Sequence, residues 1–221
     1  MFPDKYQKFI EIMTKYCDGY DEETGGHNYR LYHQLRVAET GYRICQSEEV
    51  KEANEKIVVI GGLFHDIGRI AILKENNTKT LKYEQLELDK QKGHEEASKI
   101  VLTELLAEEL SLPEIEEVCL AIHKPEDHFD RTSENKILFD ADFLDELGAL
   151  NLFRMFTYSG ITKRSLKDTL DYWFDTDRDL KLAKTDKCFT NFAKSEAKRR
   201  IDLQDQITKE LKNGGFKPGP N

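Results

Sequence analysis

The stretch Val58–Arg69, which reads VVIGGLFHDIGR, limits most strongly what this chain can fold into. Its first seven residues are apolar or glycine, and a helix that is apolar on every side lies in the middle of a domain. His65 and Asp66 follow, and neighbouring side chains on a helix point about 100° apart. Both can reach one point if the helix ends there, and Gly68 supplies a stop signal. Because burying an unpaired imidazole and carboxylate is costly, the pair predicts a partner such as a transition-metal ion.

The rest of the chain shows apolar residues at helical spacing, and convincing strand alternation is absent. With 221 residues, 38% of them hydrophobic, the chain can bury one large core. We therefore expect an all-α, single-domain helical bundle, with an exposed lysine-rich excursion at Ala71–Lys92. The expected helices cover residues 3–17, 29–46, 48–64, 94–110, 112–123, 136–152, parts of 161–190, and 191–211.

Composition excludes several classes of protein. A net charge of −9 argues against a protein that coats DNA or RNA, which would carry a basic face. No run of about 18 apolar residues exists, so we expect no membrane span, and the N-terminus lacks the apolar region of a signal peptide. The four cysteines are widely separated and form no CxxC pair, which favours reduced, mostly buried thiols in a cytoplasmic protein.

Histidines and aspartates occur at helix ends or within apolar helices on five of the expected helical segments. They are His33, His65, Asp66, His94, His123 and Asp142. Helical bundles build metal sites from side chains that several helices project inward. Histidine and aspartate ligands without cysteine suit manganese, iron, cobalt, nickel or zinc. His27 and His128 lie in expected loops, where a surface role is the simpler interpretation.

The order His…His-Asp…Asp on consecutive helices resembles the HD-domain superfamily of metal-dependent phosphohydrolases. GLFHDIGR is similar to the HD signature of that family, and DADFLDELGA is similar to its downstream aspartate motif. The resemblance covers residues 27–151 and implies an HD-type helical domain, followed by C-terminal helices at 152–212 and a frayed tail at 213–221. DADFLDELGALNLFR and the segment KTDKCFTNFAKSEAKRRIDLQDQITKE are also similar to small bacterial HD hydrolases, a group that includes nucleotide pyrophosphatases.

The resemblance implies one or two divalent metal ions per chain, with manganese, iron, cobalt, nickel, zinc or magnesium as candidates. The implied ligands are His33, His65, Asp66 and Asp142. Asp140 is the alternative for the fourth ligand, and Asp145 is expected to support the ligands rather than to bind the ion. His94 and His123 match histidines that some members use for a second metal or for the substrate phosphate.

The implied reaction is hydrolysis of a phosphoester or phosphoanhydride by metal-activated water, with a small phosphorylated molecule, such as a nucleotide, as substrate. The expected catalytic residues are Asp66, His94 and His123. The expected phosphate contacts, chosen for their nearness to the motifs, are Arg36, Arg69 and Lys74. The alternatives are a two-metal phosphodiesterase, a non-catalytic nucleotide-binding module and a di-iron oxygenase, and a homodimer is compatible with the sequence.

Overall fold

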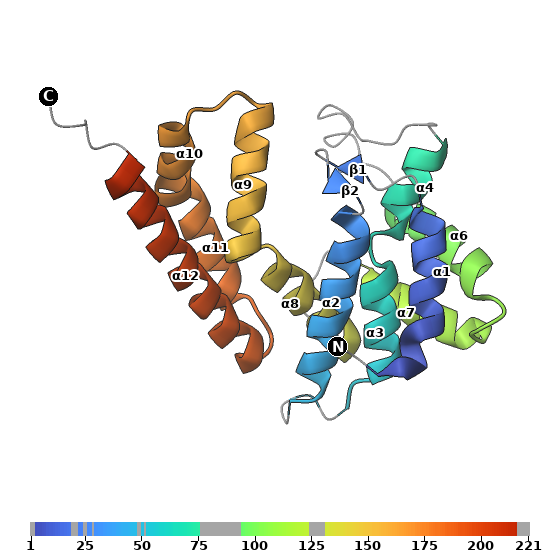
Figure 1. The fold of residues 1–221 in the computed structure, drawn as a ribbon. Coiled ribbons are helices and arrows are strands. Elements are labelled where there is room, and N and C mark those ends of the chain that lie inside the picture. The colour runs from blue at the N-terminus through green and yellow to red at the C-terminus, as the bar shows by residue number, and fades with distance from the viewer. Residues whose placement is uncertain are drawn as a thin grey trace, which may run out of the picture. The chain divides into compact units, whose positions relative to one another are not determined.

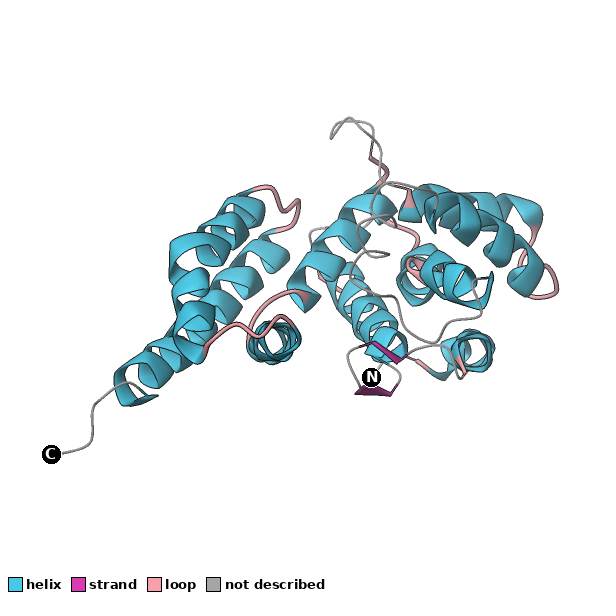
Figure 2. Ribbon diagram, turned by 90° about the horizontal axis from the view of Figure 1, so that it is seen from above, coloured by secondary structure: helices cyan, strands magenta, loops and turns pink. Residues whose placement is uncertain are grey.

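The computed structural model describes residues 3–18, 22–23, 26–27, 29–47, 50, 52–75, 94–123 and 131–215. Nearly all of the regular structure in these ranges is helical (Figures 1 and 2). The exception is a two-residue antiparallel pair, β1 (Glu22–Glu23) with β2 (Gly26–His27). The expected all-α fold is therefore confirmed.

The chain divides into two compact units, Met1–Asp142 and Phe143–Asn221, and the single-domain organisation stays a prediction. The helices of the first unit are η1 (Asp4–Tyr6), α1 (Gln7–Cys17), α2 (Tyr29–Cys45), α3 (Glu55–Phe64), α4 (Ile67–Glu75), α6 (His94–Leu106), α7 (Leu112–Ile122) and most of α8 (Ser133–Asp145). Helix α3 is central, because α1, α2 and α7 all pack against it, and each residue from 57 to 64 is buried. The expected buried apolar helix is present at this position.

Two glycines allow α2 and α3 to pack closely. A Cβ atom at Gly62 would lie 2.7 Å from the backbone Cα of Ala38, and one at Gly41 would lie 2.8 Å from a methyl group of Val58. Both distances are shorter than a carbon–carbon contact of about 3.5–4.0 Å. The backbones of the two helices can therefore approach only where the side chain is a hydrogen atom, and this approach brings their polar residues together.

Helix α3 begins later than the sequence suggests. We expected it from Glu48, but it starts at Glu55, after residues in turn or extended conformation. The side chain of Asn54 caps it by accepting a hydrogen bond from the backbone N–H of Lys56 at 3.2 Å. Asn54, which we expected inside the helix, is thus its N-terminal cap.

The prediction of one continuous helix over residues 136–152 is also wrong. This segment divides into α8 and α9 (Ala149–Ile161) at Gly148, which has a φ of 76°. Glycine adopts this backbone conformation without the steric cost that a side chain would add. At the other end of the sequence, α12 (Asn191–Gly215) runs past the predicted end at 211, so residues 213–215 are helical rather than frayed. Residues 216–221 lie outside the described ranges.

The second unit continues with α10 (Leu166–Tyr172), the π-helical turn η3 (Trp173–Asp177), α11 (Arg178–Asp186) and α12. Its core is a cluster of apolar side chains: Phe143, Leu144, Leu147, Leu152, Met155, Trp173, Cys188, Ala193, Ala197 and Ile201. Trp173 is fully buried and donates from its indole N–H to Asp205 Oδ1 at 2.9 Å. Arg178 donates to the same carboxylate at 2.8 Å. The polar end of the tryptophan therefore has a partner inside this core.

All four cysteines carry free thiols, and Cys17, Cys119 and Cys188 are buried while Cys45 is partly buried. No helix in the described part of the chain is both long enough and apolar enough to span a membrane. The cytoplasmic location stays a prediction.

Candidate metal centre

The site is organised by a two-residue break between α3 and α4. Helix α3 ends at Phe64 and α4 begins at Ile67, so His65 and Asp66 form the turn between them. The predicted cause of this break was wrong, because Gly68 lies inside α4 and its backbone N–H donates to Ser98 Oγ at 3.0 Å. Since α4 continues with buried Ala71 and Leu73, the expected excursion does not begin at residue 71.

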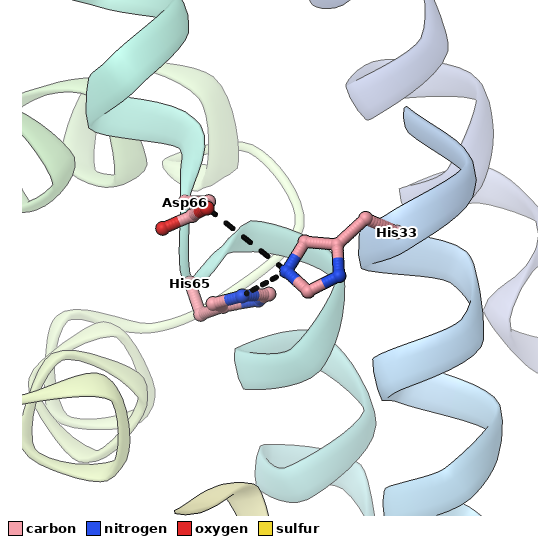
Figure 3. Close-up of side chains that lie close together, drawn as sticks. All are labelled: His33, His65 and Asp66. Atoms are coloured by element: carbon pink, nitrogen blue, oxygen red, sulfur yellow. Dashed lines mark hydrogen bonds and ion pairs between the residues drawn. The ribbon is translucent and has the colours of Figure 1, made fainter. Parts of the chain in front are cut away.

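His33 reaches this turn from α2. Its Nε2 lies 3.1 Å from His65 Nε2 and 4.0 Å from Asp66 Oδ2. Both contacts are drawn as dashed lines in Figure 3. The ligand atoms of these three side chains lie within 4.8 Å of one another. The close approach of α2 to α3 at Gly62 thus places an imidazole from one helix against the polar turn at the end of the other.

The ring of His65 is fixed by a bond to its own helix. Its Nδ1 lies 2.9 Å from the carbonyl oxygen of Gly62, which can only accept a hydrogen bond. Nδ1 therefore carries the hydrogen, and Nε2 presents its lone pair toward His33. Burial lowers the pKa of His65, and this effect outweighs the attraction of the Asp66 and Asp142 carboxylates. A neutral imidazole oriented by its other nitrogen is the form that binds a metal.

Two arginines hold the carboxylate of Asp66. Arg30 Nη1 donates to Oδ2 and Arg69 Nε donates to Oδ1, each at 3.1 Å. Burial alone would raise the pKa of Asp66, but the charges of His65, Arg69, Arg30 and His33 outweigh it and keep the pKa well below its usual value. At neutral pH His65 is uncharged, and the two guanidinium groups remain to keep this buried carboxylate ionised.

Asp142 completes the group from α8. Its Oδ1 lies 3.4 Å from His33 Nε2 and 3.8 Å from His65 Nε2. Asp140 is two residues earlier, so its side chain leaves the helix about 200° away from that of Asp142. Asp140 is fully buried, and Asp145 is buried near the end of the same helix. The carboxylate of Asp142 lies within 4 Å of both histidines of the pair.

The donor set fits a divalent transition-metal ion. Two ligand nitrogens that each lie about 2.0–2.1 Å from one ion are about 2.8–3.4 Å apart, for angles between about 90° and the tetrahedral value. The 3.1 Å separation of the two Nε2 atoms falls in this range. Two imidazoles with two carboxylates suit manganese, iron, cobalt, nickel or zinc. The arrangement can therefore hold an ion at the point where His33, His65 and Asp66 converge, with Asp142 beside it.

The structure places the other predicted residues as follows. Arg36 is partly buried one turn after His33 on α2. His123 is exposed at the C-terminal end of α7, and its carbonyl oxygen accepts a hydrogen bond from Asn135 Nδ2. His94 is the first residue of α6, and its side chain lies outside what the structure describes, as do the side chain of His27 and all of His128. The roles proposed for these residues stay predictions.

Lys74 is directed toward a different neighbour. Its Nζ lies 3.7 Å from the centre of the Tyr16 ring on α1, a cation–π contact. We predicted Lys74 as a phosphate contact because it is near the HD pair in sequence. In the structure it lies about two helical turns along α4 from that pair. Its role toward phosphate stays a prediction.

Arg30 also lies at the site, although it was not among the residues predicted from the sequence. Its side chain is 7% exposed, and it is one of the two cations on Asp66. One signal could have identified it: Arg30 precedes His33 by three residues, a spacing that puts both on one face of α2. A cation on the same face as a predicted metal ligand is a candidate partner for the carboxylate that the ligand approaches.

Several solved structures share the fold of this chain. The structure of YpgQ from Bacillus subtilis in complex with ADP is 23% identical and matches with a TM-score of 0.61, covering 96% of this chain and 98% of that chain. An HD-superfamily hydrolase from Bacillus thuringiensis is 23% identical, with a TM-score of 0.64 over 96% and 100% of the two chains. A predicted HD superfamily hydrolase from an uncultured Thermotogales bacterium is 20% identical, with a TM-score of 0.59 over 94% of this chain and 91% of that chain.

No curated protein matches the chain in sequence. The family model described as the HD domain matches residues 30–147, which is more than half of the chain. This range includes the histidine of α2, the HD turn and both candidate aspartates of α8. The chain therefore belongs to the HD domain family.

Proposed function

We propose that the protein is a metal-dependent phosphohydrolase that acts on a nucleotide or a related phosphoester or phosphoanhydride. The observation that carries this proposal is the convergence of His33, His65 and Asp66, with Asp142 beside them, on one point in the first unit. These residues come from two helices and the turn between α3 and α4, and the chain belongs to the HD domain family. A divalent ion held there would lower the pKa of a bound water molecule and would polarise a phosphoryl oxygen of the substrate.

The protein's own residues prepare the site for this chemistry. The Gly62 carbonyl oxygen fixes the tautomer of His65, and Arg30 with Arg69 fixes the orientation of Asp66. Since both oxygens of Asp66 already accept hydrogen bonds, its carboxylate is held in place rather than free to rotate. A group held in place before the substrate arrives requires less reorganisation during the reaction.

Arg69 has two roles in this proposal. Its Nε holds Asp66, and its guanidinium carries further N–H donors at a side chain that is 19% exposed. Planar guanidinium groups bind phosphate oxygens through two parallel hydrogen bonds. We therefore assign Arg69 to orientation of Asp66 and to contact with the substrate phosphate, and we assign the more deeply buried Arg30 to orientation of Asp66.

The choice of a nucleotide substrate is supported by one relative. The YpgQ structure, which matches 96% of this chain, contains ADP. ADP carries both a phosphoester and a phosphoanhydride, the two kinds of bond that the proposed chemistry would hydrolyse. The resemblance of the C-terminal segment to small bacterial HD hydrolases points in the same direction.

Metal analysis and a nucleotide screen test the proposal together. Purified protein should contain one equivalent of a transition metal, and a panel of nucleoside mono-, di- and triphosphates with Mn²⁺ should release phosphate or pyrophosphate, measured separately. His65→Ala should lose both the metal and the turnover, whereas Asp202→Asn, a change of an exposed residue on α12, should lose neither.

Three outcomes would contradict the proposal. Full turnover in His65→Ala would show that the reaction does not require the metal site. A nucleotide-induced rise in melting temperature without turnover of any nucleotide would favour a binding module. Two equivalents of metal per chain, with turnover of phosphodiesters only, would favour a two-metal phosphodiesterase.

A further inference from the structure

The second unit contains a cavity of about 250 Å³ that none of the proposed metal chemistry uses. Residues of α9, α10, η3 and α11 line it, together with Glu146 from the connection before α9 and Arg164 from the connection between α9 and α10. Its charged and aromatic lining residues are Arg154, Arg164, Lys181, Tyr158, Tyr172 and Asp177. Two guanidinium groups, one ammonium group and two phenol rings thus surround one small space.

The negative groups at this cavity are already engaged by the protein. Glu146 accepts hydrogen bonds from Lys181 at 2.7 Å and from Lys184 at 3.2 Å, so this trio has a net charge of +1. Asp177 accepts a bond from Asn151 Nδ2 at 3.4 Å. Among the lining residues, Arg154, Arg164 and Lys181 carry three positive charges against the two negative charges of Glu146 and Asp177, so the lining has a net charge of +1. This local charge is positive although the whole chain carries −9.

One of the two arginines at the cavity, Arg164, contacts an aromatic ring. The guanidinium carbon of Arg164 lies 4.9 Å from the centre of the Tyr172 ring, a cation–π contact. Tyr172 is 38% exposed and Tyr158 is 36% exposed. A guanidinium placed over a ring is already ordered, so it loses less conformational freedom when it binds an anion. Partly exposed rings nearby can also stack with a flat ligand.

The backbone at the cavity is unusual as well. The five residues Trp173–Asp177 form a π-helical turn between α10 and α11. Such turns are rare and occur frequently at functional sites, because the extra residue redirects the side chains around it. Here the turn follows Tyr172 directly and ends at Asp177, and both line the cavity.

We propose that this cavity binds a small ligand with a phosphate group and an aromatic ring, and that binding does not require the metal ion. The positive lining selects the phosphate, and the tyrosines select the ring. The volume lies just below the range of about 300–1,000 Å³ that is usual for pockets of drug-sized ligands, which restricts the ligand to about the size of a mononucleotide. The site extends ligand binding beyond the metal centre of the proposed hydrolase.

Calorimetric titration of the full-length protein in EDTA tests this site apart from the metal-dependent reaction. AMP should bind saturably at one site per chain, and adenosine or inorganic phosphate alone should bind at least about tenfold more weakly, because each lacks one of the two recognised groups. Arg164→Gln should weaken AMP binding by about tenfold or more, since it removes a charge-assisted hydrogen bond.

Arg199→Gln is the matched control. It makes the same chemical change on α12, where Arg199 is 64% exposed and pairs with Glu196, and it should leave AMP affinity unchanged. The fluorescence of Trp173, the single tryptophan, and the melting temperature report whether each variant is folded. If Arg164→Gln does not fold, Arg154→Gln replaces it with the same expected loss.

Several results would overturn the proposal. One is a failure of AMP to bind saturably in EDTA. A second is equal affinity in Arg164→Gln and Arg199→Gln. A third is loss of AMP binding in Arg69→Gln but not in Arg164→Gln, which would locate the ligand at the arginines of the first unit. Equal affinity for phosphate and AMP would show that the tyrosines do not contribute to binding of the ligand.

Discussion

Two carboxylates, Asp66 in the first unit and Glu146 in the second, have similar partners but different surroundings. Asp66 accepts hydrogen bonds from two arginines, and Glu146 accepts them from two lysines. In both cases burial alone would raise the pKa, and the cations outweigh it and lower the pKa instead. A carboxylate that is buried or partly buried and held by two cations therefore does not by itself identify a reaction site.

The surroundings of Asp66 differ from those of Glu146 in having two imidazoles. His33 and His65 lie beside Asp66 with their Nε2 atoms 3.1 Å apart, a separation that a shared metal ion explains. Glu146 adjoins a cavity lined by cations and tyrosines instead. The comparison predicts that changes at Asp66 act mainly on metal binding and turnover, and that changes at Glu146 act mainly on stability.

Replacement of Asp66 should have the largest effect. Asp66→Asn keeps the size of the side chain but removes the charge that binds a metal and balances the two arginines. We expect turnover to fall by more than about 100-fold, the upper figure for loss of a residue that merely supports a metal ligand, with a matching loss of bound metal. Metal content and single-turnover rates measure it, and retention of the metal would exclude Asp66 as a ligand.

Replacement of Arg30 should have the next largest effect. Arg30→Met removes one cation from Asp66 and keeps much of the side-chain volume, so Asp66 loses orientation but keeps Arg69. We expect a loss of about 10–100-fold in metal affinity or turnover. Lys181→Met is the matched change at Glu146, and it should leave the metal affinity unaltered. Equal loss in both variants would mean that the effect comes from general destabilisation.

Replacement of Glu146 should change stability without changing metal binding. Glu146→Gln removes the charge that holds Lys181 and Lys184, whose side chains are 16% and 34% exposed. Because water partly screens this cluster, we expect a loss of about 1–2 kcal/mol in the free energy of unfolding. Urea unfolding measures it, and metal titration of the same variant should match that of the natural protein.

The pH dependence of unfolding gives the smallest and most specific test. The pKa of Glu146 is lower in the folded protein than its ordinary value of 4.5. Its contribution to stability is therefore fully present above that ordinary value, and it is lost as the pH falls through the folded pKa. The natural protein should lose stability below about pH 5 more steeply than Glu146→Gln does. Parallel pH profiles for the two proteins would show that the contacts of Glu146 with its lysines do not contribute to the free energy of unfolding.

Local patterns were sufficient for most of the helices, and three of the candidate ligands that they singled out, His33, His65 and Asp66, lie together in the structure. The apolar run before His65 predicted a buried helix, and α3 is buried at each of its residues from 57 to 64. The break at the HD pair was also expected, but its cause was not, because Gly68 lies within α4. Cap and turn residues act through bonds to neighbours that periodicity does not reveal, and for the same reason the start of α3 at Glu55 and the break at Gly148 were missed.

The sequence by itself determined the all-α fold, the family and the candidate ligands, because apolar spacing and residue order are local properties. Tertiary structure alone decided which polar groups meet. Gly62 lets α2 approach α3 closely enough for His33 to face His65, and the packing of these helices turns Arg30 toward Asp66. Such contacts join residues more than thirty positions apart, and their distances depend on how backbones pack, which no spacing within one segment records.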